Sequence, residues 1–303
     1  MIYTLTLNPA IDYKFKLKSI ELGGLNRFQK ASFQPGGKGI NVSIVLSNLG
    51  IPNHAIAILG GWTGRYLKEC LKKDYHMDID EISVLGDTRI NVKAMVEHET
   101  EFNHIGPKVS DAIFESILAR IENFDSSDYL IVSGSVPYGQ HDAFQQIASL
   151  CMKKNIPFIM DTSGDQFHHF IDFKPFLMKP NLKELNDYLL MDLYEIDEII
   201  FYGRQLIYRG VEHLIISLGE RGSLYLNQKE SFLAQPIVSE VISTTGAGDS
   251  MIAGFIAKYI ETKDTRQSFI HAVACAQATV FSGRLATKSN IQKYVSKIII
   301  EEL

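Results

Sequence analysis

The chain has 303 residues, of which 46% are hydrophobic, and its 30 basic and 35 acidic side chains give a net charge of −5. This length suits a single large α/β unit, and the absence of a polybasic run argues against nucleic acid as the main partner. No apolar run approaches the roughly 20 residues that span a bilayer, and no signal-peptide pattern opens the chain, so we expect no membrane partner and a cytoplasmic location. Cys70, Cys151 and Cys275 are widely spaced, which predicts buried or partly buried free thiols. The adjacent His168 and His169 lack a metal-binding spacing and are expected at the surface.

Short β-rich runs alternate with helical patterns along the chain, which is typical of a mostly parallel sheet covered by helices on both faces. The predicted core strands are residues 2–7, 55–59, 129–133, 158–161 and 214–218. The predicted helices lie near residues 38–49, 64–73, 110–123, 141–154, 182–190 and 196–209. No repeat or long linker divides the chain, so we predict one domain over residues 1–303.

Two segments interrupt this alternation. Residues 11–34 are extended in pattern and polar at alternate positions, and residues 88–105 alternate Val92, Ala94 and Val96 with charged neighbours, which predicts a hairpin. By themselves the two segments indicate an ordinary pair of edge strands. A small sheet with one apolar face and an open edge can pair with a second copy, so a homodimer through this region is one expectation.

A glycine-rich motif, Pro-Gly-Gly-Lys-Gly-Ile-Asn-Val, occupies residues 35–42 and leads into the first predicted helix. Its glycines allow close approach to the backbone, Lys38 brings a cation, and Asn41 brings an amide that can donate and accept hydrogen bonds. The motif is not a Walker A loop, because Gly39 follows Lys38, and it lacks the glycine spacing of a dinucleotide-binding motif. By itself it is either a ligand-binding loop or a glycine-rich turn with a solvated lysine.

A second glycine motif, Thr-Thr-Gly-Ala-Gly-Asp-Ser, occupies residues 244–250 and opens an apolar helical pattern. Gly246, Ala247 and Gly248 would present backbone N–H groups at the positive end of a helix dipole, which favours an anion. Asp249 would repel a resting phosphate, so its position suits a base that accepts a proton during phosphoryl transfer. The alternative is a helix cap with glycines for a tight turn. Two such motifs, one near each end of the chain, favour phosphoryl transfer.

Asn181 and Glu184 lie three residues apart at the start of a predicted helix and therefore share one side of it. An Asn N-cap with an acid at the third helical position is a capping box, and the residues alone favour this interpretation. The sequence Ser-Leu-Gly-Glu-Arg-Gly at residues 217–222 follows a predicted strand and is by itself a common strand-to-turn pattern.

Five motifs together resemble the ribokinase-like (PfkB) carbohydrate kinases, and they occur in that family's order along essentially the whole chain. They are residues 6–12, 35–42, 179–184, 217–222 and 244–249. The resemblance implies a three-layer α/β/α sandwich with a mostly parallel central sheet, and a small β-sheet lid formed by residues of about 11–34 and 88–105. Ser243 stands where many members of the family carry an aspartate. A serine at this position is typical of the phosphosugar branch. Residues 88–93 resemble the 1-phosphofructokinase branch most closely.

The resemblance implies an ATP-dependent sugar-phosphate kinase that requires Mg²⁺. We predict phosphorylation of fructose 1-phosphate at its 6-hydroxyl, which yields fructose 1,6-bisphosphate. The alternative is a tagatose-6-phosphate kinase that yields tagatose 1,6-bisphosphate, because a furanose ring is nearly symmetric when its two ends are exchanged. A sugar-phosphate sensor without catalysis is less favoured, since Asp249, both glycines and Glu184 are all retained.

The same resemblance implies a role for each candidate residue. Asp249 would be the catalytic base, assisted by the backbone of Gly246, Ala247 and Gly248, and Glu184 would help to hold Mg²⁺ through water. The implied ATP-binding residues are Lys179, Asn181, Ser217, Gly219, Gly222 and Gly248. The candidates for substrate binding are Asp12, Arg27, Gly37, Lys38, Asn41 and Arg89, with the three basic residues directed at the substrate phosphate.

Overall fold

A computed structural model of the chain describes residues 1–162 and 170–303, so His168 and His169 lie outside the described residues. Ten strands form a central sheet in the order β14-β13-β12-β11-β10-β9-β8-β1-β4-β5. Their bounds are β1 Ile2–Thr6, β4 His54–Leu59, β5 Ile79–Ser83, β8 Tyr129–Gly134, β9 Phe158–Thr162, β10 Leu177–Met178, β11 His213–Ser217, β12 Ser223–Leu226, β13 Ser231–Ala234 and β14 Ile300–Glu302. Neighbouring strands from β5 to β11 are parallel, whereas β12, β13 and β14 extend the sheet in antiparallel fashion.

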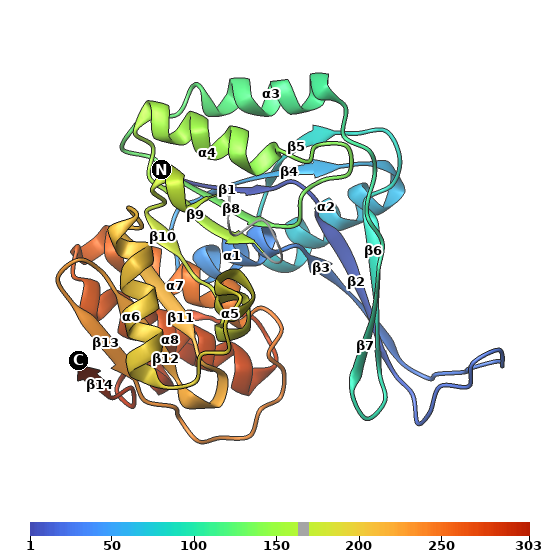
Figure 1. Cartoon of the computed structure of the whole chain (residues 1–303). Helices are drawn as coiled ribbons and strands as arrows, with labels where there is room; N and C mark the ends of the chain where they lie inside the picture. Colours follow the sequence, from blue (N-terminus) through green and yellow to red (C-terminus); the bar gives the residue numbers. More distant parts are fainter. Residues whose placement is uncertain (163–169) are drawn as a thin grey trace.

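Helices cover both faces of this sheet (Figure 1). Their bounds are α1 Lys38–Asn48, α2 Gly61–Tyr75, α3 Asp111–Ile121, α4 Ala143–Lys154, α5 Leu182–Leu189, α6 Ile196–Tyr208, α7 Ala247–Thr262, α8 Thr265–Ser282 and α9 Lys288–Val295, with short 3₁₀ turns at Ile171–Phe173 and Gly219–Arg221. Side chains alternate along the strands, so Ile131 and Ile159 pack with α1, α7 and α8, while Leu130 and Val132 pack with α3 and α4 on the opposite face. The predicted three-layer α/β/α sandwich is therefore confirmed. None of the described helices has the length and apolar character needed to cross a bilayer.

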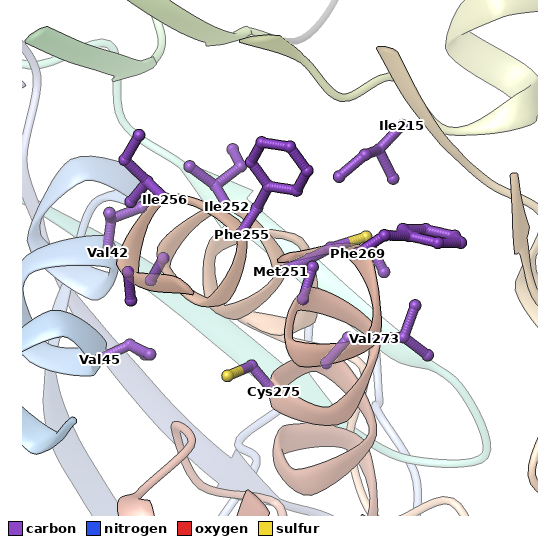
Figure 2. Packing of buried hydrophobic residues seen from close by; sticks show 14 of the residues in the cluster. Val42, Val45, Ile215, Met251, Ile252, Phe255, Ile256, Phe269, Val273 and Cys275 are labelled. Atoms are coloured by element: carbon purple, nitrogen blue, oxygen red, sulfur yellow. The ribbon is translucent and has the colours of Figure 1, made fainter. Parts of the chain in front are cut away.

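The core between α1, α7 and α8 places both glycine motifs next to each other in space, although about 200 residues separate them in the sequence. Figure 2 shows Val42 and Val45 of α1 facing α7, and Phe269 and Val273 of α8 on the other side. The two long helices approach closely because Gly254 has no side chain. A Cβ at that position would lie 2.7 Å from Sγ of Cys275 and 2.8 Å from the carbonyl oxygen of His271.

A separate four-stranded sheet, which we call the lid, has the order β3-β2-β6-β7. Its strands are β2 Ala10–Lys16, β3 Ala31–Gly36, β6 Arg89–Met95 and β7 Glu99–Asn103, and they project away from the body of the molecule (Figure 1). The predicted hairpin is thus confirmed as β6 and β7, whereas residues 11–34 contain two strands joined by an irregular loop.

The register of the lid strands gives the lid one polar and one apolar face. Asp12 lies opposite Asn91 on the polar face, and Tyr13 lies opposite Phe33 and Val92 on the other. Aromatic rings gather on that second face, where Tyr13 stacks on Phe33 with ring centroids 4.5 Å apart. The apolar face expected of the lid is therefore present, and Phe33 is 49% exposed on it.

The predicted strands and helices agree with the structure to within one or two residues at most ends. The exception among the helices is α2, which begins at Gly61, three residues before its predicted start. Strand β5, the two-residue strand β10, the antiparallel extension β12 to β14 and helix α9 were not predicted. Of the three cysteines, Cys151 and Cys275 are buried, Cys70 is half-buried, and all are free, as the sequence predicts.

Candidate active site

The second glycine motif forms the N-terminal end of α7, as the sequence predicts. Gly246 is the N-cap residue with φ +80°, a left-handed conformation that glycine adopts without strain. Ala247 is the exception among the three expected anion donors, because its N–H already donates to the carbonyl of Thr244 at 3.2 Å. The N–H groups of Gly246 and Gly248 have no acceptor within the described part of the chain, as expected for the first turn of a helix. Two of the three predicted backbone donors are therefore open to an anion.

Asp249 lies in the first turn of α7 and is only 5% exposed. Its Oδ2 accepts a hydrogen bond from Nδ2 of Asn41 at 2.7 Å, which joins the two glycine motifs directly. Burial and the negative charge of Asp161 raise the pKa of Asp249 to about 6, against the opposing effects of Lys38, Asn41 and Lys179. A carboxylate with this pKa is mostly ionised at pH 7 and is well matched to accept a proton.

Two lysines predicted for different ligands meet at a carboxylate that the sequence analysis did not single out. Asp161 is the penultimate residue of β9 and is 3% exposed, and its Oδ1 lies 3.3 Å from Nζ of Lys38 and 3.6 Å from Nζ of Lys179. Burial alone would raise the pKa of Asp161, but the two ammonium groups outweigh it and hold the pKa below its ordinary value. Burial lowers the pKa of Lys38, and Asp161, Asp249 and Glu184 more than offset that effect, so the ammonium stays charged. The result is a buried, charged cluster beside Asp249.

Lys179 lies across the start of α7. A Cβ on Gly248 would stand 2.7 Å from Nζ of Lys179, so a side chain at this point would displace the ammonium group. This contact explains why glycine occupies position 248, which the sequence alone could not show. It also places a cation within reach of any anion held by the N–H groups of the helix.

Asn181 and Glu184 form the capping box that the residues alone favoured. Oε2 of Glu184 accepts from the backbone N–H of Asn181 at 2.8 Å, and Oδ1 of Asn181 accepts from the N–H of Glu184 at 2.7 Å. The same Glu184 acts electrostatically on Lys38, so the capping box borders the charged cluster. A role in holding Mg²⁺ stays a prediction.

The loop at residues 217–222 connects β11 to β12 beside the start of α5. Ser217 pairs with Asn181 in an isolated bridge, so the two predicted nucleotide-binding segments are neighbours. Gly219 and Gly222 both have positive φ, of +63° and +95°, and a Cβ on Gly222 would collide with the carbonyl oxygen of Ala234. The turn itself therefore requires glycine at 222 and favours it at 219, whatever the loop binds.

Asp12 belongs to a polar network on the lid that sequence reasoning found only in part. Its Oδ1 accepts from Nδ2 of Asn91 at 3.2 Å, and its Oδ2 lies 3.6 Å from Nζ of Lys93, which also pairs with Glu101 at 3.1 Å. Asn91 and Lys93 were recognised as part of a family-like stretch but were not selected as site residues. The alternation of polar residues along β6 was the signal that could have identified them.

Arg89 begins β6, opposite Ala10 of the strand that carries Asp12. Its Nη1 donates to the carbonyl of His104 at 3.1 Å, whereas its buried Nε has no partner among the described residues. Burial lowers the pKa of Arg89, and the charge of Asp12 acts in the opposite direction. An unsatisfied buried guanidinium donor is what a substrate phosphate would satisfy.

The structure does not bring Arg27 to the other substrate candidates. Arg27 is exposed in the loop between β2 and β3, at the far end of β2 from Asp12. Asp12 lies near the start of β2, whereas Arg27 lies in the loop that follows Lys16, where that strand ends. Gly37 does join the cluster, at the N-cap of α1 with φ +116°, and a Cβ there would lie 2.9 Å from Cγ2 of Thr6.

The cluster sits at the carboxyl ends of the parallel strands, where β9 ends at Thr162, β10 at Met178 and β11 at Ser217. Ligands of open α/β sheets bind at this edge. Backbone donors at a helix start, two lysines and a buried carboxylate with a pKa near 6 together form a site suited to an anion and a proton transfer.

Three comparisons with known proteins agree with this geometry. The model of the pfkB family carbohydrate kinases matches residues 5–291. A 1-phosphofructokinase from Bacillus subtilis is 35% identical over 304 residues, and a D-tagatose-1-phosphate kinase from Bacillus licheniformis is 31% identical over 306 residues, with 100% of both chains covered in each case. The crystal structure of Escherichia coli phosphofructokinase-2 in complex with substrates and products superposes with a TM-score of 0.92 at 28% identity, covering 98% of each chain. The same E. coli enzyme has also been solved in a tetrameric inhibited form.

These matches confirm the family that the five sequence motifs predict, and with it a sugar-phosphate kinase fold over the whole chain. The chain belongs to the pfkB family of carbohydrate kinases.

Proposed function

We propose that this chain transfers the γ-phosphoryl group of ATP to the 6-hydroxyl of fructose 1-phosphate, yielding fructose 1,6-bisphosphate and ADP. The observation that carries the proposal is Asp249, buried beside the open N–H groups of α7 and hydrogen-bonded to Asn41 of the first glycine motif. Its relatives named 1-phosphofructokinase and D-tagatose-1-phosphate kinase both act on a ketose that carries a 1-phosphate, as their names state.

In the proposed mechanism Asp249 accepts the proton of the 6-hydroxyl as its oxygen attacks the γ-phosphorus. The bond from that phosphorus to the bridging oxygen breaks, and ADP leaves with the electron pair. The N–H groups of Gly246 and Gly248 and the ammonium groups of Lys38 and Lys179 stabilise the negative charge on the transferred group. Ala247 is assigned no contact with it, since its N–H is already engaged.

ATP would bind along the carboxyl ends of β10 and β11, where the predicted nucleotide residues lie on adjacent segments. Those residues are Lys179, Asn181, Ser217, Gly219, Gly222 and Gly248. The sugar would bind between this edge and the polar face of the lid, with Asp12 and Gly37 near its hydroxyls and Arg89 at its phosphate. The buried Nε of Arg89, unsatisfied among the described residues, supports that last assignment.

The residues around Glu184 fit Mg²⁺ held mainly by phosphates and water. Within the described residues no group of three or more His, Cys, Asp or Glu could hold a metal ion, and Mg²⁺ commonly binds through one or two carboxylates plus substrate phosphates. Glu184 engages one carboxylate oxygen in the capping box, and the other can orient a metal-bound water. When bound, the ion would neutralise charge on the phosphates of ATP.

A coupled assay of ADP release tests the substrate. Fructose 1-phosphate, tagatose 1-phosphate, tagatose 6-phosphate, fructose 6-phosphate and fructose are supplied in parallel, and their kcat/KM values are compared. We expect fructose 1-phosphate to give the highest value. Tagatose 1-phosphate is the second candidate, because the B. licheniformis relative carries that name. A highest value for a 6-phosphate would mean that the two ends of the sugar bind in the opposite direction, and no turnover of any sugar would contradict the proposal.

We further propose that the chain acts in the cytoplasm, where ATP and sugar phosphates are found, and that it forms a homodimer through the lid. The apolar lid face supports the dimer, since Phe33 is 49% and Phe102 58% exposed and a second copy could cover them. Light scattering after size exclusion should give a dimer at micromolar protein. A strict monomer that is fully active would contradict it.

A further inference from the structure

The buried carboxylate of Asp161 connects two parts of the site that come from distant segments. It lies one residue before the end of β9, whereas Lys38 begins α1 and Lys179 directly follows β10. A charged carboxylate that is only 3% exposed is strongly unfavourable unless cations compensate it, and both ammonium groups lie against the same Oδ1. Neither lysine is paired in an ideal short geometry, since the distances are 3.3 and 3.6 Å. Each ammonium has three N–H donors, so each keeps donors for a further anion.

We propose that Asp161 is a positioning residue that holds Lys38 and Lys179 together beside Asp249, so that both cations converge on the phosphoryl group while Asp249 remains an effective base. This inference rests on the proposed function, and it assigns a role to a residue that contacts neither ligand. The only proton that moves in this step goes from the sugar hydroxyl to Asp249.

The argument depends on the balance of charge around Asp249. The groups that face it are Lys38 and Asn41 from α1, Lys179 from the start of the α5 segment and Asp161 from β9, and Glu184 acts on Lys38 from α5. Two ammonium groups next to a carboxylate would make it a weak base, because they favour its charged form. The negative charge of Asp161 opposes that effect, and burial acts in the same direction. One carboxylate thus permits two cations at the phosphate without reducing the basicity of Asp249.

The position of Lys179 supports convergence on the phosphoryl group. Its Nζ lies 2.7 Å from the position that a Cβ of Gly248 would take, against the first turn of α7. The open N–H of Gly248 and the ammonium of Lys179 can therefore donate hydrogen bonds to the same bound anion. Lys38, whose side chain is 32% exposed, approaches the position of this anion from the side of the first glycine motif.

The test compares two substitutions that should move the pKa of Asp249 in opposite directions. Asp161→Asn removes the charge that raises this pKa, so the acidic limb of the kcat/KM profile should move to lower pH by about one unit, and kcat should fall by about 10²-fold. Lys38→Gln removes a charge that lowers this pKa, so its acidic limb should move to higher pH. Asp161→Glu keeps the charge and should leave the limb near its wild-type position, even if kcat falls.

The matched control is Asp128→Asn. Asp128 is also a buried aspartate, 9% exposed, but it pairs with the amino group of Met1 at 2.7 Å, before β8 at the opposite edge of the sheet. This variant should lose stability without moving the pH profile. If Asp161→Asn lowers activity with no displacement of the acidic limb, or if both substitutions move it in the same direction, the positioning role is wrong.

A second readout does not depend on the choice of sugar. The pKa of Asp249 can be measured from its carboxyl ¹³C resonance in the ligand-free protein, which should titrate near 6 in the wild type and lower in Asp161→Asn. If Asp161→Asn fails to fold, the Lys38→Gln variant still tests the direction in which charge moves the pKa of Asp249, which should be higher in that variant than in the wild type. A wild type without kinase activity would contradict the proposed function alone, whereas unchanged ¹³C titrations would contradict the role of Asp161 alone.

Discussion

Replacing Asp249 by asparagine should inactivate the enzyme and at the same time stabilise its fold. Asparagine keeps the size of the side chain and an oxygen that can accept from Asn41, so the substitution removes little except charge and basicity. Loss of a general base typically lowers kcat by about 10²- to 10⁴-fold, and 10²-fold corresponds to about 2.7 kcal/mol of transition-state stabilisation. The KM values should change only a few-fold, because the base acts in the transition state.

The stability change follows from the raised pKa of the buried carboxyl group. A folded-state pKa of about 6, against an ordinary aspartate pKa of 3.8, means that ionised Asp249 destabilises the folded state by about 3 kcal/mol above pH 6. That penalty declines as the pH falls from 6, is small at pH 4, and is absent below about pH 3, where the group is protonated in both states. The variant should therefore be more stable than the wild type at pH 7 and about equally stable at pH 4.

Steady-state kinetics and urea unfolding at pH 7 and pH 4 measure both effects on the same protein samples. Lower activity with a raised urea midpoint at pH 7 only is the expected result. An active variant would remove Asp249 from the chemistry. An inactive variant that is less stable at pH 7 would show that the carboxylate supports the structure, and that its loss of activity follows from misfolding.

Three further substitutions test the individual parts of the site. Arg89→Ala should raise the KM for the sugar phosphate by about 10- to 100-fold and the KM for ATP far less, since one charge-assisted hydrogen bond contributes roughly 1.5–3 kcal/mol; equal effects on both KM values would argue against a phosphate contact. Glu184→Gln preserves the capping box but should raise the Mg²⁺ concentration that gives the half-maximal rate by about 10-fold or more. An unchanged Mg²⁺ dependence of the rate would show that Glu184 does not help to hold the metal ion. Gly248→Ala should lower kcat/KM by about 10-fold with little loss of stability, because the new Cβ meets only the flexible end of Lys179. In the control Gly254→Ala the new Cβ meets backbone atoms of α8, so this variant should mainly lower the urea midpoint. A Gly248→Ala variant with full activity would show that the position of Lys179 is unimportant.

The elements that the sequence predicts well are those defined by local patterns. Asp249 and the two glycine motifs were found because helix starts, glycines and a following carboxylate are adjacent in the sequence, and each motif leads into an apolar helical segment. The capping box of Asn181 and Glu184 is equally local, and the structure contains it.

The residues that were missed depend on contacts between distant segments. Asp161 looks like the ordinary end of a strand until Lys38, 123 residues earlier, is placed beside it by the parallel sheet. Lys93 can be recognised as a partner of Asp12 only once the pairing of β2 with β6 is known, because that pairing places the two side chains close together. Arg27 was selected for its charge alone, and its place at the far end of β2 could not be inferred without knowing where that strand turns.

The most direct test of the account is a crystal structure with fructose 1-phosphate and a non-hydrolysable ATP analogue bound together. We expect the Asp249 carboxylate within about 2.6–3.2 Å of the sugar 6-oxygen, and the γ-phosphate on the N–H groups of Gly246 and Gly248. A carboxylate that stays on Asn41 and lies beyond hydrogen-bonding reach of any sugar hydroxyl, with the γ-phosphate elsewhere, would contradict it.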